Sequence, residues 1–260
     1  MHERKPHEVI TRRAWLRRAW PFPHIVARDV FVHEFYSELA VQLGGILARG
    51  LTDAPTGSGF ARGMSGYDAY GISITKELGE PLSLFVSAGW RDLMSDLFGI
   101  GRTPYVFAGA HHHTPCSADG FIHNDFNPVW FPRAAAQDAI QVPDAGACDF
   151  KTGAGSFSAQ EKVQTVRGAV VIFYLLNDGW QQGDGGETGL FRGPDDPHSA
   201  PAARCLPENN SLVAFECTPQ SYHAFLASRR PRTSVIMWVH RMPGEAFERH
   251  GEERLERWQT

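Results

Sequence analysis

The spacing of apolar residues divides the sequence into a helical part and a part built of short strands. Between residues 31 and 48, and again between 81 and 98, apolar side chains recur every three or four positions, which predicts two amphipathic helices. From residue 104 the apolar residues instead form short runs bounded by glycine, asparagine and aspartate, as in strands joined by turns. A charged segment from 245 to 258 predicts a final helix. The strands that we expect cover residues 24–26, 71–75, 105–107, 168–176, 188–191, 211–215 and 233–239.

This order of elements predicts a mainly β fold with flanking helices, in which the strands form a sandwich or a barrel. The 260 residues show no internal repeat and no domain-scale linker, so we expect one domain with a sizeable core. Residues 52–66 are rich in Gly, Pro, Ser and Thr and predict a loop. Residues 127–166 lack a clear periodicity, which indicates a long insertion or lid. The expected parts are a basic arm at 1–20, a helical buttress at 21–103, the β core at 104–241 and a C-terminal helix at 242–260.

Composition limits the classes of partner and the compartment. With 25 Lys and Arg against 29 Asp and Glu the net charge is −4, so nothing points to nucleic acid or an anionic membrane as partner. No apolar run approaches the roughly 20 residues of a membrane span. The four cysteines form no Cys-x-x-Cys pair, which favours a reduced cytoplasmic protein with free, mostly buried thiols, while two disulfides remain open. The arginine pairs at 12–13 and 17–18 precede no apolar segment, which favours a solvated basic arm over an export signal.

The stretch 120–126 places an imidazole and a carboxylate two residues apart, at His123 and Asp125. If the stretch is extended, strand alternation turns both side chains to one face. They are then two members of a His, His and carboxylate set, which holds Fe(II) on one side and leaves the opposite positions open. Chance alone gives roughly one His-x-Asp in a chain of this composition, so a site needs a third ligand. His223, which follows the strand 211–215, is the candidate.

A candidate anion site lies at the start of the last long strand. Alternation places Arg232 and Ser234 on one face, so a guanidinium and a hydroxyl converge on one point. An unpaired charge inside a barrel costs on the order of several kcal/mol, so we expect Arg232 to bind an anionic group such as a ligand carboxylate. The alternatives for this role are Arg229, Arg230 and Arg241, of which the first two fall in the preceding turn.

At these residues the chain resembles the Fe(II)/2-oxoglutarate-dependent dioxygenases, in particular their prolyl 4-hydroxylase-like branch. The residues that carry the resemblance are His123-Asn124-Asp125, the run 171–180 continued at 185–188, the strand 207–215, His223, and Arg232-Thr233-Ser234 with Trp238. Order and spacing agree over about residues 105–241, and the entry strand with the first helix is similar as well. The resemblance implies a double-stranded β-helix (jelly-roll) core, iron held by His123, Asp125 and His223, and 2-oxoglutarate held at its far carboxylate by Arg232. The long stretch after Asp125 departs from the family pattern, so no substrate is carried over.

The same resemblance implies Fe(II), 2-oxoglutarate and O2 as the reacting partners, with decarboxylation of 2-oxoglutarate to succinate and CO2 coupled to oxidation of an unactivated C–H bond. Halogenating relatives have a small residue where this chain has the carboxylate of Asp125, so hydroxylation is the expected outcome, with desaturation and oxidative ring closure open. Tyr174 and Ser234 are further candidates for contact with 2-oxoglutarate, although Tyr174 also fits a core position.

Candidate substrate residues lie on either side of the metal pair. In the triplet 111–113 only His111 and His113 share a face, and we expect them to contact substrate or support the site, with a solvated loop as the competing interpretation. Asn127, Trp130 and Arg133 follow the metal pair and are candidates for the pocket lining.

The sequence therefore predicts an oxygenase that hydroxylates a small polar metabolite in specialised metabolism, for example antibiotic biosynthesis. The choice of a small molecule rests on the lack of a separate peptide-binding domain, an acidic tract or a basic groove. The alternatives are a peptidyl or prolyl hydroxylase acting on a protein, a cupin-like metalloenzyme without 2-oxoglutarate, and a non-enzymatic β-sandwich binding module. The oligomeric state stays open.

Overall fold

The computed structural model describes residues 4–12, 14–53, 59–62, 67–136, 139–256 and 258. The predicted loop at 52–66 lies largely outside these residues, as do Arg13 of the predicted basic arm and most of 257–260. The helices are α1 (Pro6–Val9), α2 (His33–Leu47), α3 (Ala88–Phe98) and α4 (Pro243–His250), with 3-10 turns at Lys76–Leu78, Leu82–Val86 and Glu252–Arg254. The strands are β1 (Leu16–Arg18), β2 (His24–Arg28), β3 (Leu51–Thr52), β4 (Phe60–Ala61), β5 (Tyr70–Ile74), β6 (Val106–His113), β7 (Pro128–Pro132), β8 (Lys162–Tyr174), β9 (Thr188–Leu190), β10 (Ala203–Cys205), β11 (Ser211–Glu216), β12 (His223–Phe225) and β13 (Arg232–Arg241).

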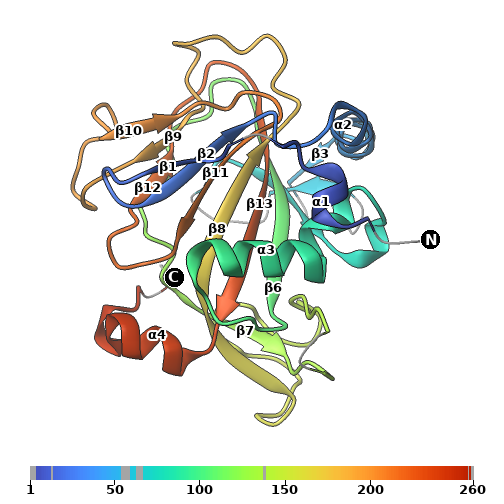
Figure 1. Ribbon diagram of the computed structural model, residues 1–260, viewed down its shortest axis with the longest axis vertical. Coiled ribbons are helices and arrows are strands. Elements are labelled where there is room, and N and C mark those ends of the chain that lie inside the picture. The colour runs from blue at the N-terminus through green and yellow to red at the C-terminus, as the bar shows by residue number, and fades with distance from the viewer. Residues whose placement is uncertain are drawn as a thin grey trace.

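Two sheets pack face to face, with α2 and α3 on the outer side of the larger one and α4 near the lower ends of β8 and β13 (Figure 1). The large sheet has the strand order β1-β2-β11-β8-β13-β6-β5-β4-β3, with β7 paired to β8, and the small sheet has the order β10-β9-β12. The strand pairs are antiparallel apart from β3 with β4. The predicted mainly β fold with flanking helices is therefore confirmed.

Strand alternation separates two apolar cores on the faces of the large sheet. The odd-numbered residues 169–173 of β8 and 235–239 of β13 pack against α2, α3 and the 3-10 turn before α3. The even-numbered residues 170–174 of β8, with Ile236 and Trp238 of β13, face the small sheet. Each fully buried large side chain contributes about 1.5–3 kcal/mol through loss of apolar surface from water. We call the side of the large sheet that faces the small sheet its inner face. At the start of β13 this face carries the polar residues of the candidate site, Arg232 and Ser234.

The two predicted helices bury the expected stripes. In α2 the buried residues are Phe35, Leu39, Leu43 and Ile46. The second helix is shorter than predicted, because residues 82–86 form a separate 3-10 turn and α3 begins only after Ser87, whose hydroxyl accepts a hydrogen bond from the backbone N–H of Trp90. The helix ends, as predicted, at Gly99, which has a left-handed backbone. The C-terminal helix is also shorter than predicted and ends at His250.

A β-bulge in β8 changes which side chains face the small sheet. The register with β13 shifts between Val239 and His240, so Gly168 is an extra residue in its strand. A Cβ atom at Gly168 would lie 3.2 Å from the side chain of Ile100, on the helix side of the sheet. Because Ala169 faces the same side, the bulge turns Arg167 to the inner face, opposite to what unbroken alternation predicts.

Two segments near the candidate ligands differ from the predicted secondary structure. Residues 120–126 do not form a regular strand, because His123 pairs only through an isolated bridge with His223 and Asp125 adopts a φ of +61°. Residues 127–166 contain more regular structure than their composition predicts, since β7 and the first part of β8 form a hairpin. The alternate residues Val129 and Phe131 of β7 are buried. Two alternating residues among many Gly, Ala and Pro residues are too short a pattern to predict this strand from the sequence.

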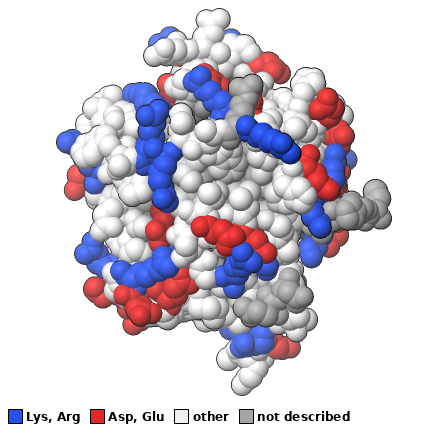
Figure 2. Space-filling model, in the orientation of Figure 1, with Lys and Arg blue, Asp and Glu red and all other residues white. Residues whose placement is uncertain are grey.

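Among the described residues, no helix is long and apolar enough to cross a membrane. The four cysteines are all free, with Cys116 exposed and the other three buried, so neither of the disulfides that the sequence left open is formed. On the face drawn in Figure 2, basic and acidic side chains lie next to one another and do not gather into a patch of one sign.

Candidate metal centre

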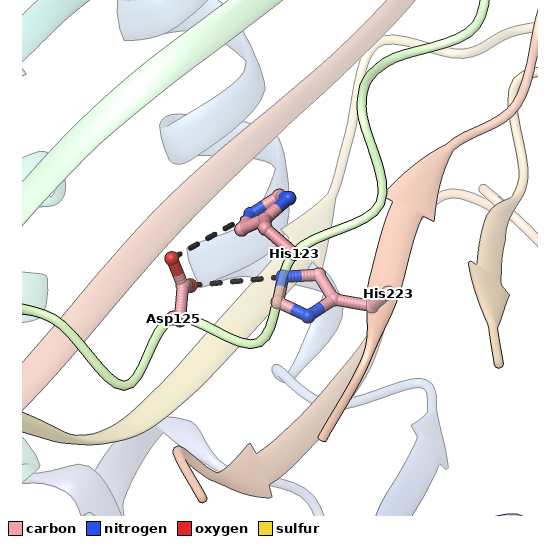
Figure 3. Close-up of side chains that lie close together, drawn as sticks. All are labelled: His123, Asp125 and His223. Atoms are coloured by element: carbon pink, nitrogen blue, oxygen red, sulfur yellow. Dashed lines mark ion pairs between the residues drawn. The ribbon is translucent and has the colours of Figure 1, made fainter. Parts of the chain in front are cut away.

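His123, Asp125 and His223 converge on one point between the two sheets (Figure 3). Nε2 of His123 lies 3.5 Å from Oδ1 of Asp125, and Nε2 of His223 lies 3.6 Å from Oδ2. The ligand atoms of the three residues all lie within 4.8 Å of one another. Two imidazole nitrogens and one carboxylate oxygen form a facial donor set of the kind that Fe(II) accepts with other positions open.

The backbone turns the two imidazoles toward the carboxylate. His123 and His223 exchange backbone N–H to carbonyl hydrogen bonds of 3.1 and 2.8 Å, which brings the loop beside β12. In each ring Nδ1 lies close to a backbone carbonyl, at 3.0 Å from Phe121 O and at 2.9 Å from Ser221 O. Because a carbonyl only accepts hydrogen bonds, Nδ1 carries the proton and the lone pair of Nε2 points at the centre.

The pKa of His223 is lowered to about 4 by burial and by the nearby His123, while Asp125 opposes this change. Burial disfavours the charged imidazolium, because that form loses its hydration inside the protein. The imidazole is therefore neutral at neutral pH, which is the form that binds a metal ion.

Asp125 is buried and is held by two side chains from the large sheet. Arg167 donates from Nη1 to Oδ1, and Trp238 donates from Nε1 to Oδ2 at 2.7 Å. Burial alone would raise the pKa of Asp125, but the Arg167 cation, the two histidines and the Trp238 hydrogen bond together hold it well below the usual range of a carboxyl group. The carboxylate is thus anionic before any metal ion binds.

Arg232 is buried at the other end of the inner face, and its hydrogen-bond partners are hydroxyl groups. Nη1 donates to Ser234 Oγ at 2.7 Å and Nη2 to Thr188 Oγ1 at 3.3 Å, while Tyr174 donates to the same Thr188 hydroxyl at 2.7 Å. Nε has no hydrogen-bond partner. In the described part of the chain no carboxylate pairs with this guanidinium. A buried cation with only hydroxyl neighbours is suited to an anionic ligand.

The predicted pair His111 and His113 lies on the inner face of β6, not in a solvated loop. The register pairs His111 with Ser234 and His113 with Arg232. The His113 ring stacks on Phe225 at 3.6 Å between centroids, and Tyr67 packs against both histidines. The pKa of His111 is lowered to about 4 by burial and by the positive charges of Arg232 and Arg167, against the opposing charge of Asp125. Charges from both ends of the inner face therefore act on His111.

Three predicted substrate residues point elsewhere. The amide of Asn127 donates to the backbone carbonyl of Glu256, Trp130 packs against Lys162, and Arg133 donates to the backbone carbonyl of Gln160. None of the described contacts of these three side chains reaches the metal centre. Their position soon after Asp125 in the sequence was a poor guide, because β7 carries the chain away from the site.

Residues 148–240 match the model of the 2OG-Fe(II) oxygenase superfamily. The matched range contains His223 and Arg232 and begins after Asp125. Over this segment, which is less than half of its length, the chain is similar to the superfamily. Members of the superfamily use Fe(II), 2-oxoglutarate and O2, and this match together with the His, Asp and His set supports a 2-oxoglutarate-dependent dioxygenase. A cupin-like metalloenzyme without 2-oxoglutarate and a non-enzymatic β-sandwich do not fit this match.

Solved structures of similar fold are oxygenases with a jelly-roll core, which confirms the predicted fold class. A prolyl 4-hydroxylase from Pseudomonas putida is 16% identical, with 84% of this chain and 92% of that chain covered and a TM-score of 0.52. A prolyl hydroxylase from Trichoplax adhaerens, solved with a peptide of hypoxia inducible factor, is 13% identical over 86% and 85% of the two chains, with a TM-score of 0.54. SnoK, a carbocyclase from nogalamycin biosynthesis, is 11% identical over 84% and 79%, with a TM-score of 0.52. Among curated proteins no sequence matches this oxygenase.

Two polar residues of the inner face, Arg167 and Thr188, could not be predicted from the sequence. Arg167 opens the apolar run of β8, where unbroken alternation places it on the helix side, and only the bulge at Gly168 reverses this. Thr188 opens the expected strand 188–191. The pattern Glu187-Thr188-Gly189 gives no signal that one hydroxyl joins Tyr174 to Arg232.

Proposed function

We propose that this oxygenase hydroxylates an unactivated C–H bond of a small polar molecule, with Fe(II) held by His123, Asp125 and His223 and the far carboxylate of 2-oxoglutarate held by Arg232. The observation that carries the proposal is the donor set of two imidazoles and one carboxylate, in which Asp125 and His223 are buried, together with the buried guanidinium of Arg232, which has no acidic partner among the described residues.

Each proposed ligand residue has a separate task. The histidines present Nε2 lone pairs because their Nδ1 protons are directed at backbone carbonyls. Asp125 supplies the negative charge that partly offsets the charge of a divalent ion. Arg232 forms charge-assisted hydrogen bonds with the anion, and Ser234, with Thr188, fixes the plane of its guanidinium. When bound, iron and 2-oxoglutarate supply the oxidation, in which 2-oxoglutarate becomes succinate and CO2 and the second oxygen atom of O2 enters the substrate.

The substrate side of the proposal has less support. The side chains that pack on one another near Arg232 are aromatic and neutral imidazole groups, namely His111, His113, Tyr67 and Phe225. Such groups exclude water and offer hydrogen bonds without charge. The similar structures include two prolyl hydroxylases and a carbocyclase of antibiotic biosynthesis, so a peptide substrate and oxidative ring closure are the outcomes that compete with hydroxylation of a metabolite. The free cysteines support a reducing compartment such as the cytoplasm.

An anaerobic titration tests the proposed ligands. Adding Fe(II) and then 2-oxoglutarate to the purified protein should produce the visible charge-transfer band of the chelate. The variant His223→Ala should lose the band, while His198→Ala should keep it, because His198 bonds to the Gly120 carbonyl and packs on the Phe191 ring and is not one of the proposed ligands. A folded wild-type protein without the band would overturn the proposal. Formation of succinate should then be compared with small polar molecules and with proline-containing peptides, and stimulation by peptides alone would favour the competing substrate class.

A further inference from the structure

The end of the chain lies against the loop that carries Asp125. The side chain of Glu256 accepts a hydrogen bond from the backbone N–H of Asn124 at 3.1 Å, and its own N–H donates to the carbonyl of Phe126 at 3.0 Å. Its carbonyl accepts from the amide of Asn127 at 2.8 Å. Glu256 therefore contacts the residues on both sides of Asp125.

Trp258 extends this contact to the residue that holds the carboxylate. Its indole N–H donates to the carbonyl of Pro128 at 2.7 Å. Its ring lies 4.9 Å from the guanidinium carbon of Arg167, and the ring of Trp238 lies 4.2 Å from the same carbon. Two indole rings therefore pack on the cation that donates to Asp125, at distances typical of cation–π contacts.

The sheets hold this loop at a few points, through the backbone bonds of His123 with His223 and the hydrogen bonds from Arg167 and Trp238 to Asp125. Asp125 has a left-handed backbone, with φ of +61°, and lies outside any strand. Within the loop, the Asn127 N–H donates to the Asp125 carbonyl and the Phe126 N–H to the Asn124 side chain. These short-range bonds shape the turn, and the contacts from Glu256 and Trp258 add to the bonds from β8, β12 and β13 that hold it against the rest of the protein.

We propose that Glu256 and Trp258, which we call the C-terminal clasp, are a positioning element for the metal centre. The clasp holds the Asp125 loop and the Arg167 guanidinium so that the carboxylate faces His123 and His223. It acts through these residues and does not touch the metal ion. The inference rests on the proposed function, because it takes Asp125 as a ligand.

Binding of Mn(II), followed by the loss of its free-ion EPR signal under anaerobic conditions, measures the effect without turnover. A chain that ends at Leu255 and the variant Trp258→Ala should each bind Mn(II) about ten-fold to a hundred-fold more weakly than the wild type, which is the usual range for residues that orient metal ligands. Trp258→Phe keeps a ring over Arg167 but loses the hydrogen bond to Pro128, so its affinity should lie in between. Glu256→Ala removes only the side-chain bond to Asn124 and should have a smaller effect. Trp20→Ala removes an exposed indole at the opposite end of the chain and serves as the control.

The visible absorption of bound Co(II) separates positioning from general destabilisation. At saturating Co(II) the clasp variants should differ from the wild type in the shape and intensity of the d–d bands, because the carboxylate meets the ion at another angle. If the shortened chain does not fold, Trp258→Phe and Glu256→Ala decide the question. Wild-type affinity and an unchanged Co(II) spectrum in these variants would overturn the inference about the clasp but not the proposed function. A wild-type protein that binds neither Mn(II) nor Fe(II) would instead overturn the proposed function.

Discussion

Arg167 donates a hydrogen bond from Nη1 to Oδ1 of Asp125, 42 residues earlier in the chain. Both side chains are buried, so the pair carries two charges into a region with little water. The pair forms only because the bulge at Gly168 turns Arg167 to the inner face of the large sheet. The contact keeps Asp125 ionised, but the positive charge of Arg167 also repels a divalent ion at the same carboxylate. Arg167 therefore makes the carboxylate ready to bind a metal ion and at the same time weakens the attraction between the site and that ion.

The variant Arg167→Met should destabilise the metal-free protein by about 3–5 kcal/mol at pH 8, because it leaves a buried carboxylate without its cation. In the wild type the pKa of Asp125 is lowered, so its contribution to stability is present above the pKa of the unfolded chain and is lost only in strong acid. In the variant, burial is the main remaining influence and raises the pKa of Asp125. The penalty should therefore shrink as the pH falls from 8 to 5. Urea unfolding in the presence of a chelator measures both values.

The control for this prediction is Arg102→Met, which removes an exposed arginine that pairs with Asp96 and Asp92. It should change the free energy of unfolding little at either pH, because solvent screens the pair. Equal destabilisation of the Arg167 variant at pH 8 and pH 5 would show that the Asp125 charge is not the cause.

The sequence predicted three side chains that the structure brings together, His123, Asp125 and His223, because residue type alone marks candidate metal ligands. Arg232 and Ser234 followed from alternation within a strand that stays regular, and their hydrogen bond shows that they share a face. The argument for facing His123 and Asp125 was nevertheless wrong. Their side chains converge through a left-handed residue and a bridge to β12, and not through an extended strand.

The parts that the sequence did not predict depend on contacts between distant segments. The role of Arg167 needs the register of β8 against β13, which a single strand pattern does not contain. The contact of Glu256 with Asn124 spans 132 residues and depends on where the chain runs after α4. Local periodicity carries no information about either.

Thiol chemistry should distinguish one cysteine from three. Cys116 is exposed, whereas Cys148, Cys205 and Cys217 are buried. Burial also raises the pKa of Cys205 to about 12 and that of Cys217 well above its usual value, so their reactive thiolates are scarce at neutral pH. With a chromogenic disulfide reagent at pH 8 we expect one fast equivalent, and three more after unfolding in urea.

The variant Cys116→Ser should lose the fast reaction and keep the three slow ones. Two or more fast equivalents in the wild type would contradict the burial of the other thiols.

Arg232→Ala should greatly weaken binding of 2-oxoglutarate and leave binding of Mn(II) alone nearly unchanged. The Arg232 guanidinium is held in place by hydrogen bonds to the hydroxyls of Ser234 and Thr188, so it is the group that would bind the far carboxylate of 2-oxoglutarate. Loss of two charge-assisted hydrogen bonds, at about 1.5–3 kcal/mol each, corresponds to at least a hundred-fold in affinity. Titration of 2-oxoglutarate into the Fe(II) protein, followed by the charge-transfer band, gives the dissociation constant.

Arg230→Ala is the matched control, because Arg230 is exposed in the preceding turn and donates to the Asp178 carbonyl. It should bind 2-oxoglutarate as the wild type does. A similar loss in both variants would indicate that the turn, and not the anion contact, determines the affinity.

Asp125→Gly should abolish hydroxylation and the Fe(II)–2-oxoglutarate band while the protein still folds. Glycine accepts the left-handed backbone of this position more readily than aspartate does, so the turn itself is not strained by the change.

The same substitution should lower the free energy of unfolding, because it leaves the buried guanidinium of Arg167 without its carboxylate partner. The double variant Asp125→Gly with Arg167→Met should therefore be more stable than the sum of the two single effects predicts, because it removes both charges. Urea unfolding of the four proteins measures this coupling, and Mn(II) binding should remain absent in both variants that lack Asp125. Full activity of Asp125→Gly would refute the assignment of this carboxylate as a ligand, whereas additive effects on stability would refute the importance of its pairing with Arg167.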